Sequence, residues 1–203
     1  MLVLAAPPGC GKTTIVQEIA KTDPMTMISV SATTRALRPG EVDGKHYYFV
    51  DRKKFQQMVD GGEMMEYALV YNSNMYGTPK APVEKALKEG RDVLFDIDWQ
   101  GNRKLSDIAK DDVVSIFLLP PSWAELERRL YDRAQDSREE ITRRLGKVPD
   151  EISHYKDFQY VLVNTDLNKT IKQVYSILEA ERIKRHRLSD LQDFVDTLKP
   201  LKK

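Results

Sequence analysis

The feature that most constrains this chain is the segment AAPPGCGKTT at residues 5–14, which follows a short apolar run at residues 2–4. The run is typical of a buried strand, and the residues after the segment carry apolar side chains at helical spacing. The segment matches the pattern G-x-x-x-x-G-K-[ST], with Ala6 in place of the first glycine. The sequence therefore predicts a phosphate-binding loop between a strand and a helix.

The residue types explain how such a loop would bind a nucleotide. Gly9 and Gly11 let the backbone turn its N–H groups inward, and a helix that begins near Lys12 adds the positive end of its dipole. Lys12 would reach the outer phosphates, and the hydroxyl of Thr13 would ligate Mg²⁺. A glycine-rich turn with a surface lysine is the alternative. The residues expected to contact ATP here are Ala6, Pro7, Pro8, Gly9, Cys10, Gly11, Lys12, Thr13 and Thr14.

Charge and composition narrow the classes of function. The 203 residues include 32 Lys and Arg against 31 Asp and Glu, a net charge of +1, so bulk charge favours neither nucleic acid nor a membrane as a partner. The single cysteine excludes an intramolecular disulfide, and the three histidines are too scattered to indicate a metal cluster with it. The sequence has no secretory signal and no apolar segment near the ~20 residues of a membrane span. We therefore expect a cytoplasmic protein.

The apolar pattern predicts an α/β fold. Strand-like runs recur at residues 27–30, 93–97, 113–118 and 160–163, with helical patterns between most of them. This alternation is typical of a parallel sheet with helices on both faces. Two S-x-x-E capping boxes, at residues 122–125 and 137–140, mark helix starts.

Three segments depart from the alternation. Residues 35–80 combine a turn-rich stretch, strand-like segments and a short helix, which predicts a small antiparallel insertion. Residues 123–147 are helical and rich in arginine, and Pro149 predicts a break near Val148. Apolar residues at three- and four-residue steps between residues 182 and 203 predict an amphipathic helix, either packed on its own domain or used as a dimer contact. The expected core is residues 1–34, 81–122 and 148–203.

A second anion site is expected after the second strand. Ser31, Arg35 and Arg38 lie close together in the sequence, and two arginines offer planar donor forks suited to a phosphate. Tyr47 could add a hydroxyl. Solvated surface arginines are an equally good reading of this stretch alone.

Longer motifs identify a family. SVSATTRALRPGEVDGKHYYFV, YGTPKAPVEKAL, GRDVLFDIDWQG, LLPPS and EISHY resemble the guanylate kinase family in order and in near spacing, over roughly residues 2–185. The resemblance implies a P-loop NTPase-type sheet, a GMP-binding insertion at residues 35–80 and a helical lid at residues 123–147. It also implies transfer of the γ-phosphoryl group of ATP to GMP, and to dGMP, with Mg²⁺, by a monomer or homodimer.

The resemblance also assigns roles by position. The acceptor phosphate would contact Arg35, Arg38, Tyr47 and Tyr76, and guanine would contact Ser31, Glu66, Thr78 and Asp98. Asp96 would support Mg²⁺ with Thr13, although the pair Asp96 and Asp98 could instead cap the next helix. Asn164 would lie near adenine, or simply end a strand. The residues expected to act in catalysis are Lys12, Arg35, Arg129, Arg133 and Arg144.

Other interpretations stay open from the sequence. A kinase for AMP or dTMP is disfavoured by Glu66 and Thr78, since a carboxylate suits the N1–H and 2-amino donors of guanine but not the bare N1 of adenine. A binding module like those of membrane scaffolds is disfavoured by Gly11, Lys12 and Thr13, because such modules lack the phosphate loop. Cys10 is either a small tolerated residue or an acidic thiol.

Overall fold

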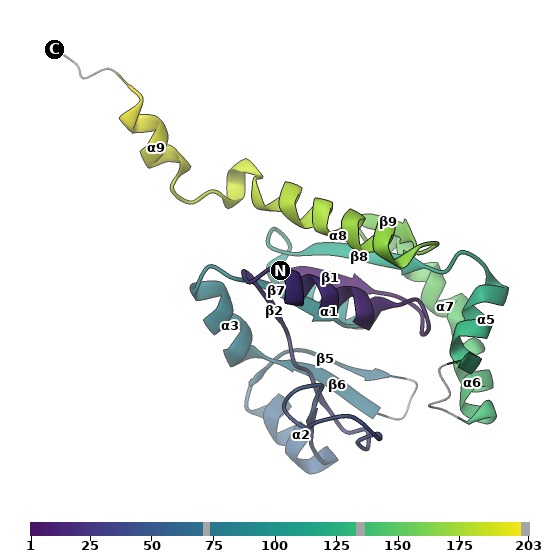
Figure 1. Cartoon of the computed structure of the whole chain (residues 1–203). Coiled ribbons are helices and arrows are strands. Elements are labelled where there is room, and N and C mark those ends of the chain that lie inside the picture. The colour runs from purple at the N-terminus through teal and green to yellow at the C-terminus, as the bar shows by residue number, and fades with distance from the viewer. Residues whose placement is uncertain (71–73, 133–136, 200–203) are drawn as a thin grey trace.

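A five-stranded sheet forms the centre of the molecule (Figure 1). The computed structural model describes residues 1–70, 74–132 and 137–199. Every strand pair of the central sheet is parallel, with β1 in the middle, so the loop after β1 leaves the centre of the carboxyl edge, where ligands bind in such sheets. In spatial order the strands are β2 (Thr26–Ile28), β7 (Asp92–Asp96), β1 (Leu2–Ala5), β8 (Val114–Leu119) and β9 (Tyr160–Val163).

Helices cover both faces of this sheet. Leu2 and Leu4 of β1 pack with α1 (Lys12–Thr22) and α8 (Leu167–Arg182) on one face. Alternate residues of β1 pack on the other face with α3 (Lys80–Lys88) and α4 (Trp99–Ala109). Burial on both faces explains why the strands read as continuous apolar runs. The predicted α/β class is confirmed.

A second, four-stranded sheet lies beside the carboxyl edge, at the bottom of Figure 1. It begins at residue 32, ahead of the expected insertion boundary at residue 35. The β3–β6 and β5–β6 pairs are antiparallel as expected, but β3 and β4 are parallel, so the sheet is mixed. Phe55 of α2 (Arg52–Asp60) is fully buried against it. Its order is β4 (Tyr48–Phe49), β3 (Ala32–Thr33), β6 (Asn74–Pro79) and β5 (Met64–Val70).

The arginine-rich segment folds into helices that lie apart from the mixed sheet, at the right of Figure 1. The serine caps of both predicted capping boxes form: the backbone N–H groups of Glu125 and Glu140 donate to the hydroxyls of Ser122 and Ser137, each at 3.2 Å. The helix breaks after Leu145 as expected, and the next one carries Pro149 in its first turn, where its missing N–H is tolerated. These elements are α5 (Trp123–Asp132), α6 (Arg138–Leu145), α7 (Val148–Ser153) and the 3₁₀ turn η1 (His154–Asp157).

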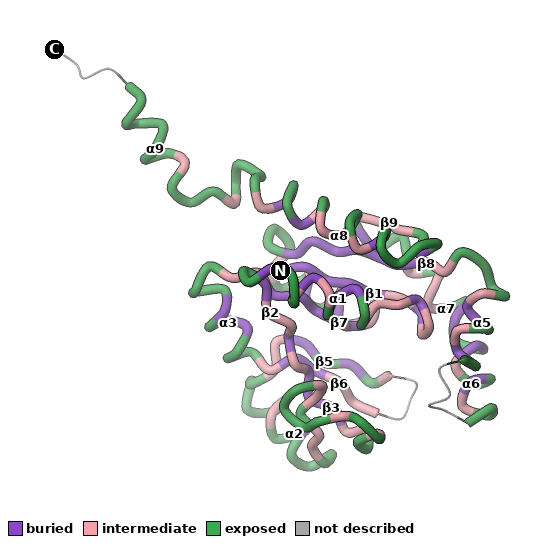
Figure 2. Tube along the Cα trace, in the orientation of Figure 1, coloured by how far each residue is buried: buried purple, intermediate pink, exposed green. Residues whose placement is uncertain are grey.

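The end of the chain differs from the expected packed helix. The 3₁₀ turn η2 (Arg185–Arg187) is held to the body by Arg187, which donates to the carbonyls of Asp111 and Asp112. The short α9 (Leu191–Thr197) projects away from the body, and no residue between 183 and 199 is buried (Figure 2). We call residues 183–199 the C-terminal arm. The expectation that it packs on its own domain was wrong, because α8 already completes the core and ends at Arg182, which is held by Asp23 and Asp92.

Candidate active site

The loop between β1 and α1 has the backbone that a phosphate cradle requires. Gly9 and Gly11 adopt φ angles of 84° and 85°, which residues with side chains avoid, and Gly11 caps α1. Ala6, in the place of the first glycine, packs against the core, so its methyl group fits. The positive end of α1 therefore faces the carboxyl edge of the sheet, where an anion would bind.

The key lysine of the loop lies against the carboxylate that ends β7. Lys12 Nζ is 2.8 Å from Asp96 Oδ1 and donates to the carbonyl of Ile97 at 3.0 Å. Burial opposes the charge on Lys12, but the ion pair and hydrogen bond with Asp96 outweigh it, so the pKa of Lys12 is raised. The hydroxyl of Thr13 donates to Asp96 Oδ2 at 2.8 Å. The two expected metal ligands, a hydroxyl and a carboxylate, are thus brought together.

The arginines expected to bind the acceptor phosphate hold an internal carboxylate. Arg35 forms a two-point pair with Glu41, at 3.0 and 2.7 Å, and the backbone N–H of Arg38 donates to the same carboxylate at 2.8 Å. These hydrogen bonds keep the pKa of Glu41 below its usual range although burial acts in the opposite direction. Sequence reasoning missed Glu41. The spacing R-x-x-R-x-x-E at residues 35–41 was the available signal.

Two tyrosines line the same anion site. The rings of Tyr47 and Tyr76 meet edge to face with centroids 5.8 Å apart, and the Arg35 guanidinium lies 5.4 Å from the Tyr47 centroid. Burial, followed by the negative charge of Asp96, raises the pKa of Tyr47 to about 12. The charges of Asp96 and Lys12 both act on Tyr47, as expected for a residue near the phosphate loop. The expected contacts of all four residues, Arg35, Arg38, Tyr47 and Tyr76, with a phosphate stay predictions.

The pair expected to read guanine is buried and already hydrogen-bonded. The Thr78 hydroxyl donates to Glu66 Oε1 at 2.7 Å across the β5–β6 pair. Burial raises the pKa of Glu66 to about 7, and the hydrogen bond from Thr78 opposes this shift. A Cβ added to Gly101 would lie 3.0 Å from Glu66 Oε2, so the glycine makes room for this carboxylate. Ser31 is also buried, in the segment that leads into β3.

Asp98 has a structural role that the sequence left open. Its Oδ1 accepts a hydrogen bond from the Gly101 N–H at 2.9 Å, so Asp98 caps α4. Asp96, two residues earlier, instead faces Lys12 and Thr13. The two carboxylates are therefore not a pair of caps, and the contact of Asp98 with a nucleoside stays a prediction.

Two of the expected lid arginines lie in the described part of the chain. Arg129 donates through Nε to Glu125 at 2.8 Å, and Arg144 donates through Nε to Glu140 at 3.0 Å. Arg133 lies outside the described residues. The neighbouring Arg128 is more exposed, with 60% of its side chain accessible.

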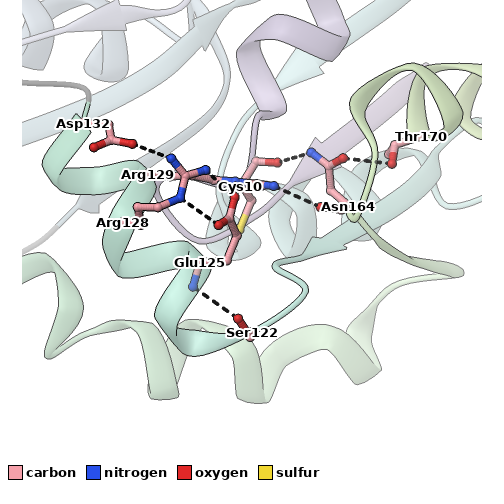
Figure 3. A network of polar contacts seen from close by, with 8 residues as sticks. All are labelled: Cys10, Ser122, Glu125, Arg128, Arg129, Asp132, Asn164 and Thr170. Carbon is pink, nitrogen blue, oxygen red and sulfur yellow. Dashed lines mark hydrogen bonds and ion pairs between the residues drawn. The ribbon is translucent and has the colours of Figure 1, made fainter.

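Asn164 connects α5 to the phosphate loop (Figure 3). Its Nδ2 donates to the Cys10 carbonyl at 2.8 Å, and its Oδ1 accepts from the Thr170 hydroxyl at 2.9 Å. Its backbone carbonyl accepts from Arg129 Nη2 at 3.4 Å. Asn164 thus stabilises the loop through the Cys10 carbonyl. Its contact with adenine stays a prediction.

The thiol of Cys10 is not acidic. Burial, only partly opposed by the charge of Arg129, raises the pKa of Cys10 to about 12. The hypothesis of an activated thiol was wrong, because the side chain is buried and a thiolate there would lose its hydration.

Comparison with known proteins tests the family assignment. A family model described as guanylate kinase matches residues 1–181. The guanylate kinase of Paramagnetospirillum magneticum is 54% identical over 199 residues, which cover 98% of this chain and 92% of that protein. The guanylate kinase of Rhodopseudomonas palustris strain BisB18 is 52% identical over 198 residues, covering 98% and 90%.

A solved structure agrees with these relatives. The crystal structure of guanylate kinase from Anaplasma phagocytophilum superposes with a TM-score of 0.84 at 36% identity, covering 100% of this chain and 96% of that chain. A phosphate loop, a second anion site beside it and a buried carboxylate on the mixed sheet are thus found in a chain that matches these enzymes over nearly its full length. The chain belongs to the guanylate kinase family of enzymes.

Proposed function

We propose that this protein transfers the γ-phosphoryl group of ATP to GMP, and to dGMP, to give ADP and the corresponding diphosphate. The observation that supports the proposal most is that two different candidate sites lie beside the carboxyl edge of the central sheet, one in the phosphate loop and one on the mixed sheet. Lys12 and Asp96 form a phosphate-loop site, and Glu66 with Thr78 forms a buried hydrogen-bonding site of the kind that guanine requires. Membership of the guanylate kinase family supports the same reaction.

Glu66 and Thr78 would select the base. The Glu66 carboxylate can accept from the N1–H and 2-amino groups of guanine, while the Thr78 hydroxyl can turn to donate to O6. Adenine would place an unpaired acceptor against the carboxylate. A site that depends on such buried hydrogen bonds rejects the wrong base by about 10⁴-fold or more. Ser31 and Asp98 would complete the nucleoside contacts.

Arg35, Arg38, Tyr47 and Tyr76 would hold the phosphate of GMP, which is itself the nucleophile. No strong base is needed, because the attacking oxygen already carries charge. The protein's task is to align two phosphates and to neutralise the charge that spreads over the transferring group. GMP would replace Glu41 as the anion held by Arg35, exchanging one carboxylate partner for a phosphate.

Mg²⁺ fits the oxygen donors beside the phosphate loop. The Thr13 hydroxyl and the Asp96 carboxylate meet at 2.8 Å, and hard oxygen ligands of this kind suit Mg²⁺. When bound, the ion would neutralise charge on the outer phosphates of ATP. Lys12 would then turn from Asp96 toward those phosphates, while Thr14 and the loop backbone hold the nucleotide.

The lid arginines would act on the transferring group. Arg129, Arg133 and Arg144 would close over it as residues 123–147 move as a lid, and water would be excluded as a competing acceptor. An arginine at such a transition state contributes about 10³ to 10⁵ in rate in related enzymes.

The first experiment measures ADP release from Mg-ATP with GMP, dGMP, AMP, dTMP, UMP and no acceptor. Wild type is compared with Lys12→Ala and with the control Lys21→Ala, which removes an exposed lysine from the same helix. Activity confined to GMP and dGMP, lost in Lys12→Ala and kept in Lys21→Ala, is the expected result. Preference for another acceptor would refute the role of Glu66 and Thr78, and inactivity with every acceptor would favour a binding module.

The C-terminal arm supports a homodimer. It exposes apolar side chains, among them Phe194 at 59% and Leu198 at 67%. A basic stretch at residues 184–187 precedes Asp190, Asp193 and Asp196, of which the last two lie in α9. Two arms in antiparallel contact would pair opposite charges, which fits the self-complementary surface of a two-fold interface. Light scattering of wild type and Phe194→Asp tests this, and a wild-type mass that stays monomeric at all concentrations would contradict it.

The cytoplasm is the proposed location. A free, buried Cys10 suits a reducing compartment. In the described residues, none of the helices combines the length and the apolar character needed to cross a membrane. Fractionation of the source cells, with the protein followed by antibody, tests this proposal.

A further inference from the structure

Two helices of the lid segment repeat one sequence pattern. Residues 122–129 read SWAELERR and residues 137–144 read SREEITRR, so both fit S-x-x-E-x-x-R-R. In each helix the serine hydroxyl accepts a hydrogen bond from the backbone N–H of the glutamate three residues later. The two adjacent arginines follow the glutamate by three and four residues, the spacings at which side chains meet on a helix.

The repeated residues make the same contacts, atom for atom. In α5, Arg128 holds both oxygens of Glu125 through Nε and Nη2, at 2.9 and 2.8 Å, while Arg129 donates through Nε to Oε1 at 2.8 Å. In α6, Arg143 holds both oxygens of Glu140 through Nε and Nη2, at 2.8 and 2.9 Å. Arg144 donates through Nε to Oε1 at 3.0 Å. A shared geometry on two separate helices points to a shared task.

Both glutamates are strongly held in the charged form. Hydrogen bonds from Arg128 and then Arg129 lower the pKa of Glu125 to about 2. Hydrogen bonds from Arg143 and then Arg144 lower the pKa of Glu140 to about 2, although partial burial opposes the shift. Partly exposed ion pairs within a helix add little to stability, so the arrangement is better explained by what it does to the second arginine.

The second arginine of α5 is the one that approaches the phosphate loop. Because Glu125 engages Nε of Arg129, the two terminal amino groups are left for other partners, and Nη2 lies 3.4 Å from the carbonyl of Asn164. The Asn164 side chain in turn donates to the carbonyl of Cys10 inside the loop. Figure 3 shows this path from Glu125 through Arg129 and Asn164 to Cys10.

We propose that Glu125 and Glu140 are positioning residues for phosphoryl transfer: each fixes Nε of the following arginine, Arg129 or Arg144, and so aims its guanidinium at the transferring group. Arg128 and Arg143 hold each carboxylate from the other side, which sets its orientation. This inference rests on the proposed roles of Arg129 and Arg144. Misplacing a catalytic group by about 1 Å can cost about 10²-fold in rate.

The test replaces Glu125 by Gln, which keeps the side-chain length and the capping-box preference but removes the charge and one carboxylate oxygen. We expect kcat to fall about 10-fold or more, with the KM for GMP changed less than about twofold, because the arginine acts on the transition state and not on the acceptor. Glu127→Gln is the matched control, since it makes the same change on the same helix and Glu127 has no ion pair in the described part of the chain. It should leave kcat unchanged.

A double-mutant cycle separates positioning from a merely structural effect. If Glu125 acts through Arg129, then Glu125→Gln has no further effect on kcat in an Arg129→Ala background. The same cycle with Glu140 and Arg144 should give the same result. Melting temperatures of all variants are measured alongside, and are expected to match wild type closely.

Three results would overturn the inference. An Arg129→Ala variant with unchanged kcat would refute the proposed role of Arg129 and this inference with it. A low kcat in Arg129→Ala but a normal kcat in Glu125→Gln would refute the inference alone and leave the proposed function standing. Equal losses from Glu125→Gln with and without Arg129 would show that the glutamate acts by another route.

Discussion

Titration of Glu66 is expected to make GMP binding depend on pH through the neutral range. Burial raises the pKa of Glu66 to about 7, and the Thr78 hydrogen bond only partly opposes this. In the proposed complex, only the ionised carboxylate accepts from both guanine donors. GMP must therefore bind the ionised fraction of the protein, and that fraction falls as the pH is lowered.

The size of the effect follows from the pKa. For one group with a pKa of about 7, about 90% is ionised at pH 8 and about 10% at pH 6, and the apparent Kd varies inversely with that fraction. Binding is expected to be about tenfold weaker at pH 6 than at pH 8. The measurement is calorimetric titration of GMP into wild type and Glu66→Gln at pH 6, 7 and 8.

The Glu66→Gln variant is the control for the ligand's own titration, because the GMP phosphate also loses charge near pH 6. Gln cannot ionise, so any pH dependence that remains in the variant belongs to the phosphate and the other residues. The reasoning is refuted if the wild-type Kd changes no more steeply with pH than the Kd of the variant.

The same carboxyl group links stability to pH, and the sign can be worked out. The pKa of Glu66 is raised from 4.5 to about 7 on folding, so the folded protein holds the proton more tightly than the unfolded chain. The stabilising contribution is complete below pH 4.5 and is lost as the pH rises through about 7, a difference of about 3 kcal/mol. Urea unfolding should therefore show Glu66→Gln to be more stable than wild type at pH 8, with a smaller difference at pH 5.5.

Three further predictions concern the phosphate loop. Gly11→Ala should lower the free energy of unfolding, measured with urea, by more than Gly90→Ala. Both glycines have positive φ, but only a Cβ at residue 11 would meet a neighbouring atom, Asn164 Nδ2 at 2.9 Å. Asn164→Ala should cost about 1–3 kcal/mol in the same assay and raise the KM for ATP, because it removes the side-chain donor to the Cys10 carbonyl, whereas the Thr170 hydroxyl keeps its bond to the Asp166 carbonyl. Cys10 should react with iodoacetamide at pH 8 only after unfolding; rapid reaction in the native protein, followed by mass spectrometry, would contradict its burial.

Local patterns were sufficient to predict the core and the phosphate loop. The apolar run before the loop, the glycines and Lys12 are neighbours in sequence, so their structure follows from short-range geometry. The strand at residues 160–163 and both serine caps were found in the same way. Each of these features is decided within a few residues of chain.

Long-range contacts set the limits of that reasoning. Glu41 is only six residues from Arg35, so its omission is a missed local signal and not a long-range contact. Asn164 lies 154 residues from Cys10, and a lone Asn after a strand carries no pattern that predicts this contact. The apolar steps between residues 182 and 203 predicted an amphipathic helix, and within that range the described part of the chain beyond α8 is α-helical over residues 191–197. Periodicity cannot tell whether the core has a face left to receive such a helix.

The carboxylates paired with the site's cations should weaken the binding of polyanions that compete with nucleotides in the cell. A cluster of uncompensated lysine and arginine side chains in a cleft attracts RNA and other polyanions without regard to sequence. Among the described residues, four cations of the site each have an acidic partner, so a long polyanion would gain little from them, whereas a nucleotide that matches the donors can displace the partners one at a time. The pairs are Lys12 with Asp96, Arg35 with Glu41, Arg129 with Glu125 and Arg144 with Glu140.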